Sequence, residues 1–263
     1  MELFDSHAHY NDEKFNEDRE EILQAVAEEG ITKLICAGYS LESSKQAVEI
    51  ANSHSNIYAI VGISPNDIPE QGIEYEDVLN QQIKQIQELA KNEKVVGIGE
   101  IGLDYYWNTE NKKEQKLAFK KQIELANKLE LPIVIHTREA IYDTLEVLKN
   151  EIAPIKKGVF HCCPLNLDLI REGLKLGFYI SFAGPITFKN AKNAEQAIKE
   201  VPLDRILIET DSPYLAPEPK RGTRNDSRNV KYVAEKIAKV KQIPIEEVAR
   251  ITYQNATKVL QIV

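Results

Sequence analysis

Short apolar runs rich in β-branched residues alternate with longer, charged, amphipathic segments along the 263 residues of this chain. Strands that alternate with helices predict a parallel sheet, because a right-handed helical crossover must bring each strand alongside the previous one. The apolar runs begin near Leu3, Lys33, Ile57, Val95, Ile133, Val159, Phe178 and Ile206. About eight such units in a chain of this length favour the α/β class and a single (β/α)8 TIM barrel.

Helical patterns fill most of the intervals between these runs. They cover Asp18–Glu29, Glu42–Asn52, Val78–Asn92, Glu114–Glu130, Ile141–Asn150 and Leu167–Leu176. Two more, Val230–Val240 and Ile245–Leu260, are separated by Pro244, a residue typical of the first turn of a helix. We predict that these two are the last barrel helix and an extra C-terminal helix. The main alternative, an open doubly wound sheet, normally has a glycine-rich phosphate loop after its first strand, and this chain has Asp5-Ser6-His7-Ala8-His9 there.

The composition limits the partners of the protein. No linker or low-complexity tract divides the chain, so residues 1–263 are expected to form one domain. A formal net charge of −8 argues against coating nucleic acid with the whole surface, so a nucleic-acid substrate would need a local basic patch or bound cations. An odd number of cysteines and the lack of a secretion signal predict a cytoplasmic protein. No apolar run is long enough to predict a membrane span. We also expect no obligate protein partner.

Metal-ligating residue types follow the predicted strands. Four of the five histidines and two carboxylates do so, namely His7, His9, His136, His161, Glu100 and Asp211. In a barrel the C-terminal ends of all strands converge on one face, where the active sites of this fold are built. His7 and His9 are two residues apart on a strand, so they point the same way and could bind one cation. Glu100 is the candidate to bridge two cations about 3.5–4 Å apart, an arrangement used by many phosphodiester and amide hydrolases.

The remaining histidine and the three cysteines are interpreted as structural. His54 lies in the polar stretch Asn52-Ser53-His54-Ser55, between a helix and a strand. Cys36 lies within an apolar strand and is predicted to be a core residue. Cys162 and Cys163 follow His161, where one of them could contact a metal, but free cysteine usually packs as a small hydrophobe. We therefore favour packing for both.

The motifs around these residues resemble those of the TatD-type metal-dependent deoxyribonucleases, over essentially the whole chain. The matching stretches are Asp5-Ser6-His7-Ala8-His9, Gly99-Glu100-Ile101-Gly102-Leu103-Asp104-Tyr105, Ile135-His136-Thr137-Arg138, Val159-Phe160-His161-Cys162 and Ile208-Glu209-Thr210-Asp211-Ser212-Pro213-Tyr214-Leu215. The resemblance implies an amidohydrolase-like barrel with a two-metal site. Its ligands would be His7, His9, Glu100, His136, His161 and Asp211.

One stretch departs from this family. After the third strand, members commonly have Gly-Ile-His-Pro-His, and this chain has Gly62-Ile63-Ser64-Pro65-Asn66. Ser64 and Asn66 could donate hydrogen bonds to a phosphate, but they carry no positive charge. Reduced activity or a different substrate therefore stays open. Many related barrels bridge their metals with a carboxylated lysine, and Glu100 in that role favours the nuclease family over dihydroorotase-like and hydantoinase-like enzymes.

The expected mechanism uses two divalent cations to activate a water molecule, with Asp211 as both a metal ligand and the general base. The scissile phosphate would lie across the two cations during an in-line displacement. Histidine-rich ligation suits Zn²⁺ as the bound metal. Mg²⁺ or Mn²⁺ could serve for activity, because cellular abundance can outweigh affinity.

Candidate substrate contacts surround the predicted site. They are Ser64, Asn66, Asp104, Tyr105, Arg138, Arg221 and Arg224. Arg221 and Arg224 belong to a basic stretch at 220–228 that we predict to contact phosphates, with a solvated charged loop as the alternative. The aromatic run Tyr105-Tyr106-Trp107 could stack on a terminal nucleotide base or only pack over the barrel rim.

The leading functional hypothesis is metal-dependent hydrolysis of DNA phosphodiester bonds by an exonuclease, acting on single strands or frayed ends. A second hypothesis keeps the site and changes the substrate, giving an amidase, an esterase or an aminoacyl-tRNA deacylase, because a binuclear site can activate water against carbonyl or phosphorus centres. A non-enzymatic metal-binding protein is the third. We disfavour it because all six expected ligands are present.

Overall fold

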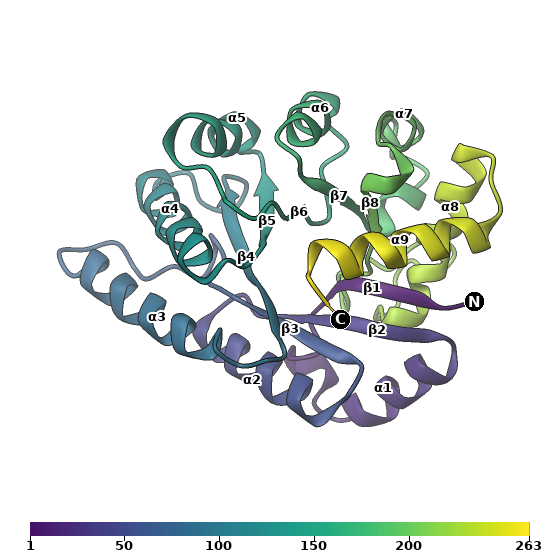
Figure 1. Ribbon diagram of the computed structural model, residues 1–263, viewed down its shortest axis with the longest axis horizontal. Coiled ribbons are helices and arrows are strands. Elements are labelled where there is room, and N and C mark those ends of the chain that lie inside the picture. The colour runs from purple at the N-terminus through teal and green to yellow at the C-terminus, as the bar shows by residue number, and fades with distance from the viewer. Residues whose placement is uncertain (263) are drawn as a thin grey trace.

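The computed structural model describes residues 1–262 and contains an eight-stranded parallel sheet. The strands are β1 (Leu3–Ala8), β2 (Ile31–Ala37), β3 (Ile57–Val61), β4 (Val95–Asp104), β5 (Ile133–Arg138), β6 (Val159–Phe160), β7 (Tyr179–Phe182) and β8 (Ile206–Ile208). Each strand pairs with its neighbour in the sequence, so the order in the sheet runs from β1 to β8. Helices surround these strands (Figure 1). The predicted TIM barrel is confirmed.

Apart from α7, the helices match the predicted patterns, with shifts at their ends. They are α1 (Arg19–Glu28), α2 (Leu41–Ser53), α3 (Tyr75–Leu89), α4 (Lys112–Leu129), α5 (Ile141–Glu146), α6 (Leu167–Lys175), α7 (Ala194–Glu200), α8 (Val230–Lys241) and α9 (Ile245–Val259). The pattern at Ile141–Asn150 continues past α5 as a π-helical turn at Val147–Glu151. The patterns did not include α7, whose seven residues bury only Ala194, Ala197 and Ile198 and so give a weak helical periodicity.

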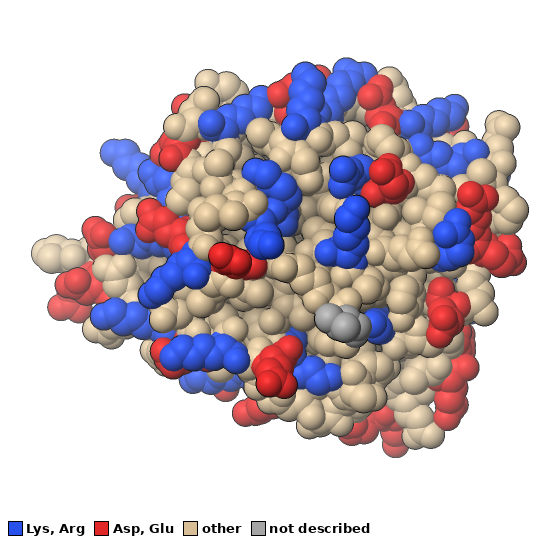
Figure 2. All heavy atoms as spheres, viewed as in Figure 1, with Lys and Arg blue, Asp and Glu red and all other residues tan. Residues whose placement is uncertain are grey.

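The extra helix α9 closes one end of the barrel interior. The interior cluster takes buried side chains from every strand and packs them against α9; it consists of Phe4, Ile35, Ala37, Ile60, Val96, Val134, Val159, Tyr179, Leu207, Ala256, Val259, Leu260 and Ile262. In Figure 1 this helix crosses in front of the strands, beside the start of β1. Acidic and basic side chains are interspersed on this face (Figure 2). Because α9 closes the end near the start of the strands, the candidate metal ligands lie at the opposite end, where the strands finish.

Hydrogen bonds between β1 and the segment after β8 bring the two edges of the sheet together. The amide of Asp211 donates to the His7 carbonyl at 2.9 Å, and the amide of His9 donates to the Ser212 carbonyl at 2.6 Å. The buried Asp5 carboxylate accepts from the Thr210 amide at 2.9 Å. These bonds place Asp211 directly beside the two histidines of the N-terminal strand.

Strand β4 deviates from regular pairing where it passes β5. Its register shifts between Ile98 and Ile101, and Gly102 adopts a φ of +145°. A Cβ atom at Gly102 would lie 1.9 Å from the His136 carbonyl oxygen, so only glycine allows the two strands to approach this closely. The irregular stretch includes Glu100, two residues before the glycine that lies opposite His136.

No helix within residues 1–262 is both long enough and apolar enough to cross a membrane.

Candidate metal centre

The six predicted ligands come together at the C-terminal ends of the strands. They lie in or directly after β1 (His7, His9), in β4 (Glu100), in β5 (His136), after β6 (His161) and after β8 (Asp211). The sequence placed Glu100 at the end of its strand, but β4 continues to Asp104. Glu100 reaches the centre from within the strand, in the stretch where the register shifts between Ile98 and Ile101.

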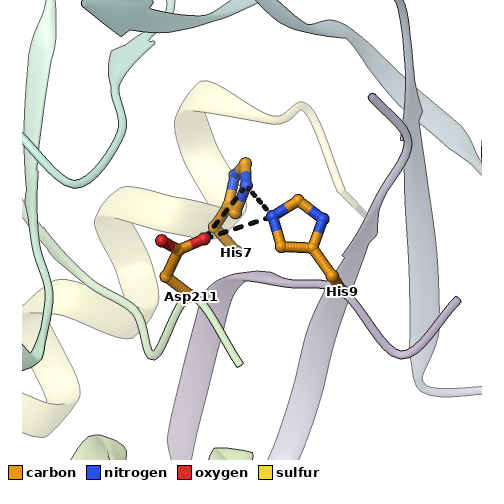
Figure 3. A group of neighbouring side chains, drawn as sticks. All are labelled: His7, His9 and Asp211. Carbon is orange, nitrogen blue, oxygen red and sulfur yellow. Dashed lines mark hydrogen bonds and ion pairs between the residues drawn. The ribbon is translucent and has the colours of Figure 1, made fainter. Parts of the chain in front are cut away.

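The first group of donor atoms is formed by His7, His9 and Asp211 (Figure 3). The Nε2 atoms of the two histidines are 3.3 Å apart, and Oδ1 of Asp211 lies 3.1 Å from Nε2 of His9 and 3.9 Å from Nε2 of His7. Asp211 has a φ of +56°, a left-handed conformation that aspartate tolerates better than most residues. All three side chains point at one small volume, which a single cation fits.

The second group is formed by Glu100 with the other two histidines. Its Oε1 atom lies 2.9 Å from Nδ1 of His136 and 3.3 Å from Nε2 of His161. Its Oε2 atom faces the first group, at 3.5 Å from Nε2 of His7 and 3.7 Å from Nε2 of His9. Glu100 thus has one oxygen toward each pair of histidines, as a bridging ligand requires.

Oxygen atoms outside the two groups orient three of the four histidines. Nδ1 of His9 lies 3.0 Å from the Ala37 carbonyl oxygen, which can only accept a hydrogen bond, so this nitrogen carries the proton and Nε2 presents a lone pair. Carboxylates act in the same way on His136 (Asp104, 2.9 Å) and His161 (Glu209, 3.3 Å). Carboxylate or carbonyl support of this kind is typical of metal-binding histidines. The donor set therefore fits divalent cations.

The centre concentrates charge in a buried volume. Burial alone would raise the pKa of Glu100, but His161, His136 and His7 hold it well below its usual value. Burial likewise opposes ionisation of Asp211, yet contact with His9 lowers its pKa to about 2. Without a cation, protonated histidines supply the positive charge that these two buried carboxylates need, and bound cations would supply it in their place.

A cavity of about 690 Å³ opens over the candidate ligands. It is lined by Ser64, Asn66, Asp104 and Arg138, four of the expected substrate contacts, together with Tyr39, Asp67, Trp107, Cys162 and Tyr214. Ser64 Oγ donates to Asp67 at 2.6 Å, and Asn66 Nδ2 donates to Asp104 at 3.2 Å. The departure from the family motif therefore pairs two neutral side chains with two carboxylates.

Three predicted substrate contacts lie elsewhere. The Tyr105 side chain is buried and its hydroxyl donates to Asp143 at 2.6 Å. Arg224 donates to the Asp18 carboxylate at 3.0 Å and to the Lys14 carbonyl at 2.6 Å, so its charge is paired near the start of α1. Arg221 lies over the ring of Phe188. Within residues 1–262, none of these three side chains lines the cavity over the ligands.

Glu209 was quoted within a motif but received no role from the sequence. It is fully buried, accepts from the Cys162 amide at 2.7 Å and orients His161. Its position two residues before Asp211, at the end of β8, is the signal that could have identified it. Asp5 was likewise quoted within a motif without receiving a role, and it too lies two residues before a predicted ligand, His7.

The residues interpreted as structural mostly behave so. His54 follows α2 and contacts the Ile50 carbonyl at 3.0 Å and Glu20 at 3.1 Å. Cys36 and Cys163 are buried core residues. Cys162 differs, because it is only partly buried and lines the cavity. Burial and neighbouring carboxylates raise the pKa of its thiol well above the usual value. The packing prediction therefore describes Cys163 better than Cys162.

A parallel barrel with histidines and carboxylates converging at the C-terminal ends of its strands is the arrangement of a metal-dependent hydrolase. The family model described as TatD related DNase matches residues 4–261. The chain belongs to this family.

Curated relatives and solved structures agree with this assignment. The chain is 42% identical over 260 residues to the uncharacterized metal-dependent hydrolase YabD of Bacillus subtilis, with 99% of each protein covered. It is 35% identical over 269 residues to the uncharacterized metal-dependent hydrolase YcfH of Escherichia coli K12, covering 100% of this chain and 97% of that protein. The crystal structure of YJJV, a TatD homolog from Escherichia coli K12, superposes with a TM-score of 0.91 at 26% identity, covering 99% and 98% of the two chains.

Proposed function

We propose that the protein hydrolyses phosphodiester bonds of DNA, as an exonuclease on single strands or frayed ends, and that two divalent cations serve it. The observation that carries this proposal is the position of Glu100, whose two oxygens lie 2.9–3.7 Å from nitrogens of His136, His161, His7 and His9. One carboxylate shared between two pairs of histidines suits a two-metal site. The family assignment supports DNA as the substrate class.

In this proposal the cations, when bound, supply Lewis acidity toward water and toward the phosphate oxygens. Zn²⁺ suits the histidine-rich ligands, and Mg²⁺ or Mn²⁺ could serve in activity. Asp211 accepts the proton of the attacking water as general base. Asp104 and Glu209 keep His136 and His161 in the orientation that leaves their lone pairs toward Glu100. Arg138, on the cavity wall, contacts the phosphate. Three free cysteines favour a cytoplasmic location.

A second candidate is an ester or amide hydrolase, such as an aminoacyl-tRNA deacylase. The observation that favours it is the pairing of Ser64 with Asp67 and of Asn66 with Asp104. These two positions therefore offer no positively charged side chain to a phosphate. The metal centre itself would serve either substrate.

The deciding experiment is hydrolysis of end-labelled single-stranded DNA by metal-stripped protein resupplied with Mg²⁺, Mn²⁺ or Zn²⁺. We expect stepwise shortening that requires added metal and is lost in His136→Ala. His54→Ala is the matched control, because His54 lies outside the centre and should keep full activity. No cleavage with any metal, in protein shown to bind two ions, would contradict DNA hydrolysis and favour the carbonyl substrate.

A further inference from the structure

A second cavity of about 540 Å³ adjoins the one over the metal centre. Its walls come from the loops that follow β3 and β4, and its lining consists of Pro65, Asn66, Ile68, Pro69, Glu70, Gln71, Trp107, Asn108 and Asn111. Asn66 and Trp107 line both cavities, so the two lie side by side. We refer to this second cavity as the amide pocket, after the four amide side chains in its lining. A substrate bound at the metal centre could extend into it.

An aromatic and cationic group marks the junction between the two cavities. The Trp107 side chain is 69% exposed, although its ring packs edge-on against Tyr106 with centroids 4.8 Å apart. The Arg138 guanidinium lies 3.6 Å from the centre of the Tyr106 ring and 5.5 Å from that of Trp107. An exposed, supported indole ring is the kind of surface on which nucleic-acid bases stack, and the adjacent arginine suits a phosphate.

The polar groups of the amide pocket suit a neutral ring with hydrogen-bonding edges. Each amide uses one atom within the protein: Asn66 and Gln71 donate through nitrogen to Asp104 and the Glu110 carbonyl, while the oxygens of Asn108 and Asn111 accept. Among the hydrogen bonds of residues 1–262, this leaves two amide oxygens as acceptors and two amide nitrogens as donors. Side chains recognise nucleobases through such combinations of hydrogen-bond donors and acceptors.

The negative charge of the amide pocket disfavours the phosphate group of a nucleotide. Glu70 is the charged residue in its described lining, and it is negative. A phosphate would be repelled there, whereas an uncharged base would not. The metal cavity, in contrast, has Arg138 on its wall for the phosphate.

We propose that the amide pocket binds the nucleobase adjacent to the scissile phosphodiester. This base would stack on Trp107, and the phosphate between the base and the metal centre would lie beside Arg138. This assignment rests on the proposed hydrolysis of DNA and adds a subsite to it. It makes the protein selective for a chain of at least two nucleotides over a simple phosphodiester.

The direct test uses fluorescence, because Trp107 is the only tryptophan of the chain. Metal-loaded protein is titrated with a short phosphorothioate oligothymidylate, which resists cleavage, and with a base-free deoxyribose phosphate chain of equal length. We expect saturable quenching or a spectral shift with the oligothymidylate and none with the base-free chain. The same response to both, or no response to either, would overturn the base-binding assignment.

The kinetic test compares Trp107→Ala with Trp107→Phe on oligothymidylate and on bis(p-nitrophenyl) phosphate. Loss of stacking should lower kcat/KM for oligothymidylate by about 5- to 150-fold, and much less for the small diester, because stacking on an aromatic residue contributes that factor per base. Phenylalanine should restore most of the loss. Tyr142→Ala removes another exposed aromatic side chain outside both cavities and should change neither substrate.

The outcomes separate this proposal from the one it rests on. Quenching by the phosphorothioate oligothymidylate, with no cleavage of ordinary single-stranded DNA, would support the base subsite and contradict DNA hydrolysis. Cleavage without quenching, or an equal loss on both substrates in Trp107→Ala, would overturn the base subsite while leaving DNA hydrolysis in place.

Discussion

Glu209 contacts the candidate ligand His161 from outside the two groups of donor atoms. Its carboxylate is fully buried and orients His161 while accepting from the Cys162 amide. Glutamine at this position keeps an oxygen acceptor but loses the charge that strengthens the imidazole as a ligand. We therefore expect Glu209→Gln to weaken metal affinity roughly 10- to 100-fold.

A metal titration against a competing chelator measures this change. Glu246→Gln, the same substitution on an exposed residue at the start of α9, is the matched control. Equal affinities in the two variants would show that the carboxylate of Glu209 is not needed to support His161.

Asp211 allows ligand and base roles to be separated. Asparagine also tolerates the left-handed φ of +56° found here, so Asp211→Asn should fold normally. It removes the negative oxygen that would accept a proton. We expect kcat for DNA to fall by roughly 10²–10⁴-fold, the usual contribution of a general base. Kinetics should be paired with metal analysis of the purified variant, because full hydrolysis by a variant that still holds its metal would remove Asp211 from this role.

At the scale of the elements, the loop between β8 and α8 contains two arginines in different environments. The Arg224 charge is paired with Asp18, whereas Arg221 lies over the aromatic ring of Phe188. The structure therefore revises the expectation that both contact DNA phosphates in the same way. Arg224 ties the loop to the start of α1, whereas Arg221 has no ion-pair partner within residues 1–262 and keeps its charge available for a substrate.

We expect Arg221→Ala to raise KM for DNA and to flatten its salt dependence by about 0.7 in the log–log slope, the value for one phosphate contact on a single strand. Arg224→Ala should leave that slope unchanged and lower thermal stability slightly, because its ion pair is partly exposed. The measurement is KM between about 50 and 200 mM salt. Equal slopes for both variants and the wild type would show that neither arginine contacts a DNA phosphate.

At the scale of the whole molecule, one buried carboxylate joins the first strand of the barrel to two segments that follow the last strand. Asp5 accepts hydrogen bonds from the Thr210 amide and hydroxyl and from the Ser227 hydroxyl, and its side chain has no exposed surface. Removing it leaves several donors buried without a partner. We expect Asp5→Ala to lower the free energy of unfolding by roughly 2–5 kcal/mol, because each unsatisfied buried group costs about 1–3 kcal/mol.

Denaturant unfolding followed by circular dichroism measures this change. Asp168→Ala provides the comparison, since the Asp168 carboxylate is 86% exposed on α6. A loss for Asp5→Ala no greater than that for Asp168→Ala would mean that the barrel closes without this network.

Sequence patterns were enough to predict the barrel, its eight strands and the six residues that meet at their ends. Periodicity decides these features because burial on both faces of a parallel strand demands continuous apolar runs, and the C-terminal ends of such strands must share one face. It missed α7, whose two turns bury too few apolar residues to show a period.

The tertiary structure alone decided what each polar residue near the centre does. Asp104 and Tyr105 are adjacent in the sequence, yet one orients His136 and the other bonds to Asp143 outside the cavity. Arg224 was indistinguishable from Arg221 until Asp18 was found beside it. These partners lie 32 to 206 residues away along the chain, so local pattern could not specify them. Side-chain pairing is set by the closed barrel, which brings distant loops together at one mouth.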